Sequence, residues 1–166
     1  MTLSTTKGEK AASSILGPQS PKDSLVGKTP EVQIYACHPQ YLERVWPVIE
    51  PWLARALTFG PDLWTTEFIG QQLQNKERIL WLATTETEIL GFCITTLTTF
   101  PKGMVLEINW TGGATHKGRY WMHQMFDVLK AWGLHCGANK LGGGGRRGWL
   151  EMFGFKEHGV MFVLEI

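Results

Sequence analysis

A glycine-rich segment followed by two arginines is one part of the chain whose residue types could bind a ligand. Glycines occupy positions 142 to 145, ahead of the two arginines and Gly148. Consecutive backbone N–H groups can form an anion-binding concavity, and guanidinium groups add positive charge beside it. The segment lacks the Gly-Lys-Ser/Thr ending of a P-loop. An anion site and a flexible connection with solvated or ion-paired arginines are therefore equal alternatives for Gly143, Gly144, Gly145, Arg146 and Arg147.

The histidines and cysteines form no motif that indicates a metal or a nucleophile. Five His residues occur without an H-E-x-x-H sequence, so no metal site is expected. No Ser-His-Asp or Cys-His constellation has supporting motif context. The cysteines lie far apart in apolar or strand-like settings, which predicts reduced, buried thiols in a cytosolic compartment. They are Cys37, Cys93 and Cys136.

The length and charge of the chain narrow its class. It has 166 residues, a net charge of +1 and 43% hydrophobic residues, which suits one domain with a tail. Lysines and arginines are scattered, apart from one Arg-Arg pair, so no specific nucleic-acid site is expected. The apolar runs fall well short of about 18 residues, which predicts that no segment spans a membrane.

The elements around the Gly/Arg segment predict a βαβ unit. The pattern predicts a strand over 104–110, a glycine-bearing turn over 111–118, an amphipathic helix over 119–132, a short strand over 139–142 and a short helix over 149–153. Two strands joined by a helix in this way are expected to be parallel. The apolar stripe of the long helix is expected to form part of the core.

Four further segments have the composition of strands. Alternating or β-branched residues predict strands over 32–36, 78–84 and 89–100, with Gly91 marking a bulge. The end of the chain, 155–166, is expected to form a closing hairpin that ties the C-terminus into the sheet.

Two segments have helical spacing. Apolar residues over 38–57 recur as on one face of a helix, but Pro47 and Pro51 remove backbone donors. A kinked helix or two short helices are therefore expected. Thr65 is the predicted N-cap of a second helix that ends near Gln74.

The first 30 residues have a different composition from the rest. Thr, Ser, Lys, Gly and Pro dominate, so the segment cannot bury enough apolar area to offset its ordering entropy. The interpretation is a flexible tail over 1–30, followed by a folded domain over 31–166. Two apolar pairs are candidates for contact with a partner chain, namely Ile15, Leu16, Leu25 and Val26.

The element order over 32–166 resembles that of the GNAT superfamily, the Gcn5-related N-acetyltransferases. The segment WLEMFGF at 149–155 is similar to the second half of the A-x-x-L-Y-E-K-L-G-F helix with which many members close. The resemblance implies an α/β (α+β) fold. Its sheet would be mixed and mostly antiparallel, with a central parallel βαβ unit and flanking helices.

Within the superfamily, the chain most resembles small GNAT-like proteins encoded by tailed bacteriophages. These carry V-W-P in an early helix, G-G after the central strand, A-x-x-x-G-C at a helix end and a G-R-x-G-W loop. The matching pieces lie at 45–47, 112–113, 131–136 (with an extra Leu-His) and 145–149.

The resemblance implies an acetyl-coenzyme A site at the start of the long helix. The family places R/Q-x-x-G-x-G/A there, so that backbone N–H groups at the helix N-terminus face the pyrophosphate. Here Thr115 replaces Arg/Gln, and Tyr120 replaces the last small residue. The residues expected to hold the cofactor are Gly112, Gly113, Lys117, Gly118 and Arg119.

The resemblance also implies a base and an acid for acyl transfer. Glu107 matches the central-strand Glu that family members often use as the base, although it could instead face solvent or pair with an arginine. Leu150 occupies the position of the family's helical Tyr and cannot donate a proton. Tyr120 is the substitute candidate for the acid.

Three functional hypotheses follow. The first is a non-enzymatic, phage-encoded virion or assembly component with no cofactor, which contacts other phage proteins through its tail and forms a homo-oligomer in a particle. The second is an active N-acetyltransferase that moves acetyl from acetyl-coenzyme A to an amine. The third is a module that binds anions or small ligands. The first predicts a location in the virion or the host cytoplasm. Fold alone does not choose among these hypotheses.

Overall fold

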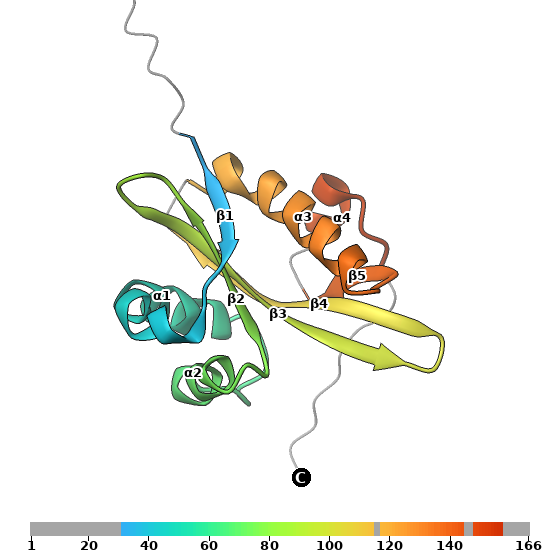
Figure 1. Cartoon of the computed structure of the whole chain (residues 1–166), viewed down its shortest axis with the longest axis horizontal. Coiled ribbons are helices and arrows are strands. Elements are labelled where there is room, and N and C mark those ends of the chain that lie inside the picture. Colours follow the sequence, from blue (N-terminus) through green and yellow to red (C-terminus); the bar gives the residue numbers. More distant parts are fainter. Residues whose placement is uncertain (1–30, 115–116, 145–147, 158–166) are drawn as a thin grey trace, which may run out of the picture.

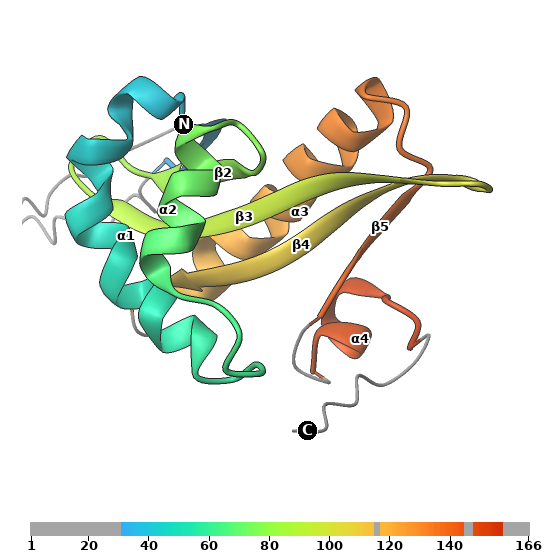
Figure 2. The ribbon, with the colours of Figure 1, turned by 90° about the horizontal axis from the view of Figure 1, so that it is seen from below.

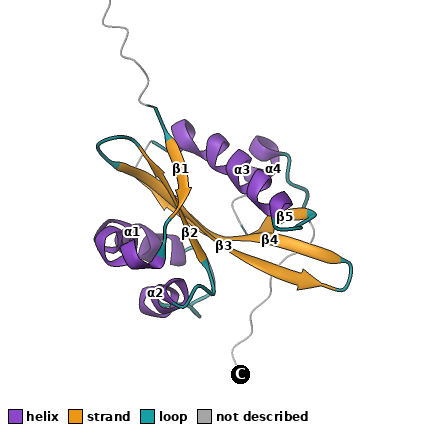
Figure 3. Cartoon of the chain, viewed as in Figure 1, coloured by secondary structure: helices purple, strands orange, loops and turns teal. Residues whose placement is uncertain are grey.

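The computed structural model describes residues 31–114, 117–144 and 148–157 of the chain, and side chains throughout except those of Arg119 and Tyr120. The segments expected to form the tail and most of the closing hairpin lie outside these ranges. Figure 1 shows a central sheet with helices on both faces, and Figure 3 shows the same view coloured by helix and strand.

Five strands form one sheet in the order β1-β2-β3-β4-β5. The first three neighbouring pairs are antiparallel, whereas β4 and β5 are parallel. This is the mixed, mostly antiparallel sheet with a parallel βαβ unit that the sequence predicts. The strands are β1 (Gln33–Ala36), β2 (Ile79–Thr84), β3 (Ile89–Phe100), β4 (Gly103–Gly113) and β5 (Lys140–Gly143).

The helices cover both faces of the sheet (Figures 1 and 2). One apolar cluster joins one face of the sheet to α1 and α2, and the other joins the opposite face to α3 and α4. All eight Trp side chains are buried or half-buried. The helices are the 3-10 helix η1 (Pro39–Tyr41), α1 (Leu42–Leu57), α2 (Thr66–Gln74), α3 (Gly118–His135) and α4 (Gly148–Phe153).

The α1 helix runs without interruption through Pro47 and Pro51, so the alternative of two short helices is wrong. Its inward face buries Ile49 and Leu53 completely against the sheet. This burial offsets the two missing backbone donors. The α2 helix begins as predicted, because the Thr65 hydroxyl accepts a hydrogen bond of 3.2 Å from the backbone N–H of Phe68.

The predicted turn over 111–118 is too long. The β4 strand continues to Gly113, because Thr111, Gly112 and Gly113 pair with residues of β3. Consequently two of the predicted site glycines lie in a strand.

A bulge is present beside Gly91, where the sequence predicts one. The register between β2 and β3 shifts between Ala83, which pairs with Gly91, and Thr84.

Candidate functional site

An opening between the two parallel strands is the feature of the fold that could admit a ligand. The strands β4 and β5 pair only from Val105 with Lys140 to Ile108 with Gly143. Beyond Ile108, β4 continues to Gly113 while β5 ends, and Figure 2 shows the two strands diverging. Within the described residues, the β5-facing edge of β4 past Ile108 has no strand partner. Unpaired backbone donors and acceptors of this kind can bind a ligand.

A bulge lies at the start of this free stretch. Ile94 of β3 pairs with Trp110 and Thr95 pairs with Ile108, so Asn109 is the extra residue of β4. A bulge bends its strand and redirects the side chains around it. The bulge thus adds a local bend at the point where β4 and β5 separate.

Gly143 explains where the strands separate. It has a φ of +153°, and a Cβ atom at this position would overlap the carbonyl oxygen of Ile108. A Cβ at the next residue, Gly144, would meet nothing within 4 Å. The first two residues of the predicted anion loop therefore lie beside the opening. Gly145, Arg146 and Arg147 are outside the described residues.

The N-terminus of α3 follows β4 after a short connection. Gly118 is the first helical residue, and Arg119 and Tyr120 belong to the first turn. The side chain of the N-cap residue, Lys117, makes no capping hydrogen bond, and the first turn contains no acidic residue. The backbone N–H groups and the positive dipole end of a helix N-terminus can bind an anion. A Cβ at Gly118 would contact only the sulfur of Met122, at 3.4 Å.

The charge of Lys117, predicted to contact the cofactor, is already engaged. Its Nζ atom lies 2.7 Å from both carboxylate oxygens of Glu88, in the turn between β2 and β3. Both side chains are partly exposed, at 40% and 47%. The pair competes with any phosphate for the lysine ammonium.

Packing within the sheet explains why the last two residues of β4 are glycines. A Cβ at Gly112 would come 2.6 Å from the ring of Phe92, and one at Gly113 would come 2.5 Å from the Leu90 carbonyl oxygen. Close packing of β3 against β4 therefore requires small residues here. Their predicted contact with a cofactor stays a prediction.

Glu107 lies in the paired part of β4 and is half-buried. Its Oε2 atom accepts a hydrogen bond of 3.0 Å from the Thr98 hydroxyl. Side chains alternate along a strand, and Leu106 and Ile108 belong to the α3 core. Glu107 therefore faces the side of the sheet that carries α1 and α2. Pairing with an arginine is the alternative role that the sequence predicts for Glu107. In the structure Glu107 interacts electrostatically with Arg78.

Sequence reasoning missed Arg78. Its Nη1 atom donates a 2.7 Å hydrogen bond to Oδ1 of Asn109, and its guanidinium lies 5.2 and 5.0 Å from the ring centroids of Trp64 and Trp110. Burial lowers the pKa of Arg78, and the nearby carboxylates, Glu107 first, oppose that shift. The strand pattern over 78–84 gave no signal for this role, because the partners are distant in sequence.

The WLEMFGF segment attaches α4 to α3 through aromatic packing. Phe126 of α3 lies 5.7 Å from Trp149 and 4.0 Å from Phe153, measured between ring centroids. Leu150 is half-buried and carries no ionisable proton. The motif thus explains how α4 docks, while the family's Tyr position supplies no acid in this chain.

Other classes of site find no support in the described ranges. There, no group of three His, Cys, Asp or Glu side chains converges to hold a metal ion. No helix in those ranges is long and apolar enough to cross a membrane. Cys93 is buried, while Cys37 and Cys136 are half-buried, and all three are free thiols.

Comparison with solved structures identifies the architecture. A ribosomal-protein-alanine N-acetyltransferase from Brucella melitensis has a TM-score of 0.64 and 16% identity, with 82% of this chain and all of that chain (100%) covered. An aminoglycoside N-acetyltransferase in complex with CoA has a TM-score of 0.61 and 15% identity, with 85% of this chain and 99% of that chain covered. A predicted acetyltransferase with acetyl-CoA from Clostridium acetobutylicum has a TM-score of 0.62 and 15% identity, with 81% of this chain and 96% of that chain covered.

Sequence comparison adds nothing to this likeness. No family model matches the chain, and no curated protein matches it. At identities of 15 to 16%, the structural matches establish a common fold and leave the activity open. The chain therefore has the GNAT fold, the architecture of these acetyltransferases.

Proposed function

We propose that the protein is an N-acetyltransferase that moves an acetyl group from acetyl-coenzyme A to an amine. The observation that carries the proposal is the edge of β4 beyond Ile108, which has no strand partner in the described residues and precedes the N-terminus of α3. One stretch of chain thus offers a ligand first the backbone groups of a strand edge and then the N–H groups of a helix end.

The residues present fit acetyl-coenzyme A through their backbone more than through their charges. The β4 edge over 109–113 would hold the extended, amide-bearing arm of the cofactor. The amides of Gly118, Arg119 and Tyr120 would hold its pyrophosphate, because the first turn of α3 contains no acidic residue. Lys117 would contribute its positive charge to the phosphate site only after its ion pair with Glu88 is broken. When bound, the cofactor supplies a thioester as the acyl donor.

Glu107 is the proposed general base. The Glu107 carboxylate can act as the base that accepts a proton from the amine. Thr98 holds one carboxylate oxygen by a 3.0 Å hydrogen bond, which leaves the other oxygen for the acceptor. Tyr120, in the first turn of α3, stays the candidate proton donor to the leaving thiolate.

The comparisons favour this enzymatic alternative over the virion hypothesis, because the matched solved structures include named acetyltransferases. The virion role, its phage partners and the contacts of the tail residues stay predictions, since residues 1–30 lie outside the described ranges. The anion-module hypothesis also stays a prediction, because Arg146 and Arg147 lie outside the described ranges.

An acyl-transfer assay tests the proposal. The purified full chain is incubated with acetyl-coenzyme A and a set of primary amines, and release of free coenzyme A thiol is measured. We expect Glu107→Gln to lower kcat by about 10²- to 10⁴-fold, the usual contribution of a positioned base, and to leave the affinity for acetyl-coenzyme A unchanged. An equal kcat in wild type and variant would remove Glu107 from the mechanism.

A further inference from the structure

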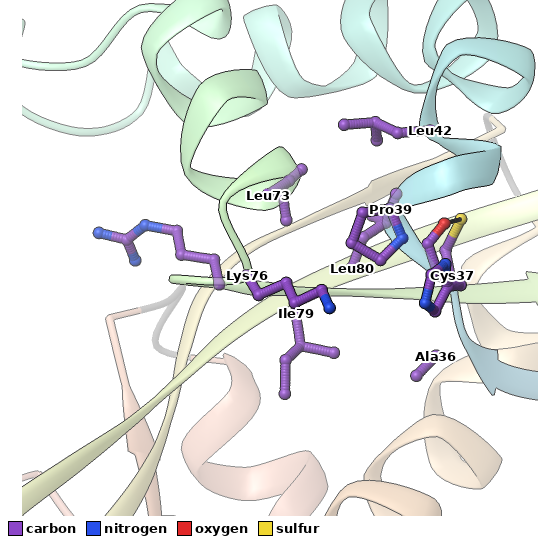
Figure 4. A pocket seen from close by; sticks show the side chains of 10 residues that line it. Ala36, Cys37, Pro39, Leu42, Leu73, Lys76, Ile79 and Leu80 are labelled. Carbon is purple, nitrogen blue, oxygen red and sulfur yellow. Dashed lines mark hydrogen bonds between the residues drawn. The ribbon is translucent and has the colours of Figure 1, made fainter.

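A pocket lies away from the β4–β5 opening, and the acyl-transfer proposal assigns no cofactor contact to it. Its volume is about 400 Å³, and none of its lining residues comes from β4, β5 or α3. It lies between the end of β1, η1, the start of α1, the end of α2 and the start of β2 (Figure 4). This volume falls within the range of about 300 to 1,000 Å³ that is typical of small-molecule sites.

The walls of the pocket are apolar. Leu42, Leu73 and Leu80 line it and are only 7%, 3% and 2% exposed. Pro39 and Ile79 complete the apolar lining. Such walls favour the apolar body of a ligand over water.

The charged groups of the lining are all positive. Lys76 and Arg78 line the pocket, and no Asp or Glu does. Figure 4 shows the Lys76 side chain pointing into the pocket from the end of α2. The described ranges contain two ion pairs, and neither involves Lys76. By contrast, Arg78 donates hydrogen bonds to Gln72 and Asn109.

Two other titratable groups lie near Lys76. The carboxylate of Glu77 accepts hydrogen bonds from the side chains of Gln72 and Asn75, which hold it outside the lining. The Nδ1 atom of His38 accepts from the backbone N–H of Gln40, so Nε2 carries the proton of the neutral ring. The lining therefore presents the ammonium of Lys76 without an ion-pair partner in the described ranges.

Lys76 has an unfavourable backbone conformation. Its φ is +61°, and it is the sole non-glycine residue with positive φ in the described ranges. Its N–H bonds to the Leu73 carbonyl and the next N–H bonds to the Gln72 carbonyl, the pattern with which glycine commonly ends a helix. A lysine here retains backbone strain that glycine would relieve. The residue that accepts this strain is the one whose ammonium enters the pocket.

We propose that this pocket binds a small apolar monocarboxylic acid. The hydrocarbon body lies among Leu42, Leu73 and Leu80, and the carboxylate contacts the ammonium of Lys76. The apolar walls select against inorganic anions, and the positive lining selects against amines and uncharged hydrocarbons. The proposal uses none of the backbone groups assigned to the cofactor, although Arg78 of the lining also neighbours Glu107.

Calorimetric titration of the full chain with hexanoate, hexylammonium and hexanol at one ionic strength tests this site. Lys76 is exposed, so we expect hexanoate to bind about two- to fivefold more tightly than either matched ligand, as an exposed ion pair implies. Lys76→Gly should weaken hexanoate binding by the same factor of about two to five and raise the unfolding midpoint. Lys102→Ala, which removes a positive charge from an exposed turn, should change neither quantity.

A second variant blocks the pocket itself. Ala36→Phe places a ring where Ala36 lines the pocket on β1, and it should abolish hexanoate binding while the circular dichroism spectrum stays native. Equal binding of hexanoate and hexylammonium, unchanged binding in Lys76→Gly or Ala36→Phe, or no hexanoate heat at millimolar concentration would overturn the proposal. Tighter binding of a peptide with a C-terminal leucine would assign the pocket to a protein tail instead.

Discussion

The Nζ atom of Lys117 lies 2.7 Å from both carboxylate oxygens of Glu88, directly before the first residue of α3. One cation next to the proposed pyrophosphate site, Lys117, is therefore held by the turn between β2 and β3. Binding of acetyl-coenzyme A must compete with this ion pair or proceed without Lys117.

Glu88→Gln should strengthen acetyl-coenzyme A binding, because it releases Lys117 for the phosphates. Exposed ion pairs contribute about 0.2–1 kcal/mol, so the gain in affinity should be up to about fivefold and should shrink at high salt. Calorimetry at two salt concentrations measures it. Glu86→Gln removes the same charge from the same turn without this contact, so an equal gain in Glu86→Gln would contradict a specific role for the pair.

Gly143→Ala should destabilise the protein by roughly 1–3 kcal/mol, because the added Cβ overlaps the Ile108 carbonyl and φ is positive. Gly144→Ala is the matched control, since a Cβ there meets nothing within 4 Å and should change stability by no more than about 0.5 kcal/mol. Urea unfolding gives both values. Similar losses in the two variants would mean that the separation of β4 and β5 does not depend on Gly143.

Thr95→Val should cost about 1–3 kcal/mol of the free energy of unfolding. The Thr95 hydroxyl accepts a 2.9 Å hydrogen bond from Nε1 of Trp81 in the buried core, and valine of similar shape leaves that donor unpaired. Thr95→Ser keeps the acceptor and loses one methyl group, so it should cost about 1 kcal/mol. If serine proved as destabilising as valine in thermal unfolding, the hydrogen bond would not be the stabilising feature.

The thiol of Cys93 should resist alkylation in the native protein. Burial raises its pKa far above the ordinary value, so almost no thiolate forms at neutral or mildly alkaline pH, and the side chain is inaccessible. Burial also raises the pKa of half-buried Cys37, by less. Mass spectrometry after iodoacetamide treatment at pH 7.5 should find Cys37 modified before Cys93. Modification of Cys93 at the rate seen in urea would contradict the core assignment.

The strands of the described ranges and the Thr65 helix cap could be predicted from sequence because their signals are local. The long strand over 89–100 and the Thr65 cap are both encoded within a few neighbouring residues. The uninterrupted α1 could not be predicted, because the burial of Ile49 and Leu53 that outweighs its prolines depends on the assembled sheet.

The candidate site was predictable only in part, for the same reason. The family resemblance pointed to Glu107 through its place on the central strand, but its neighbours Arg78, directly before β2, and Thr98, in β3, come from other parts of the chain. The Glu88 contact of Lys117 spans 29 positions, and the two residues share no local pattern. The close approach of Gly143 to Ile108 likewise exists only after β4 and β5 pair.

Calorimetric titration of the full chain with acetyl-coenzyme A tests the central claim most directly. We predict micromolar binding, weakened at least about tenfold by Gly118→Trp, because the indole would cover the first amides of α3. Gly60→Trp, an exposed position in the connection between α1 and α2, should bind as wild type does. No heat at millimolar acetyl-coenzyme A, or unchanged affinity in folded Gly118→Trp, would contradict the claim that this opening holds the acyl donor.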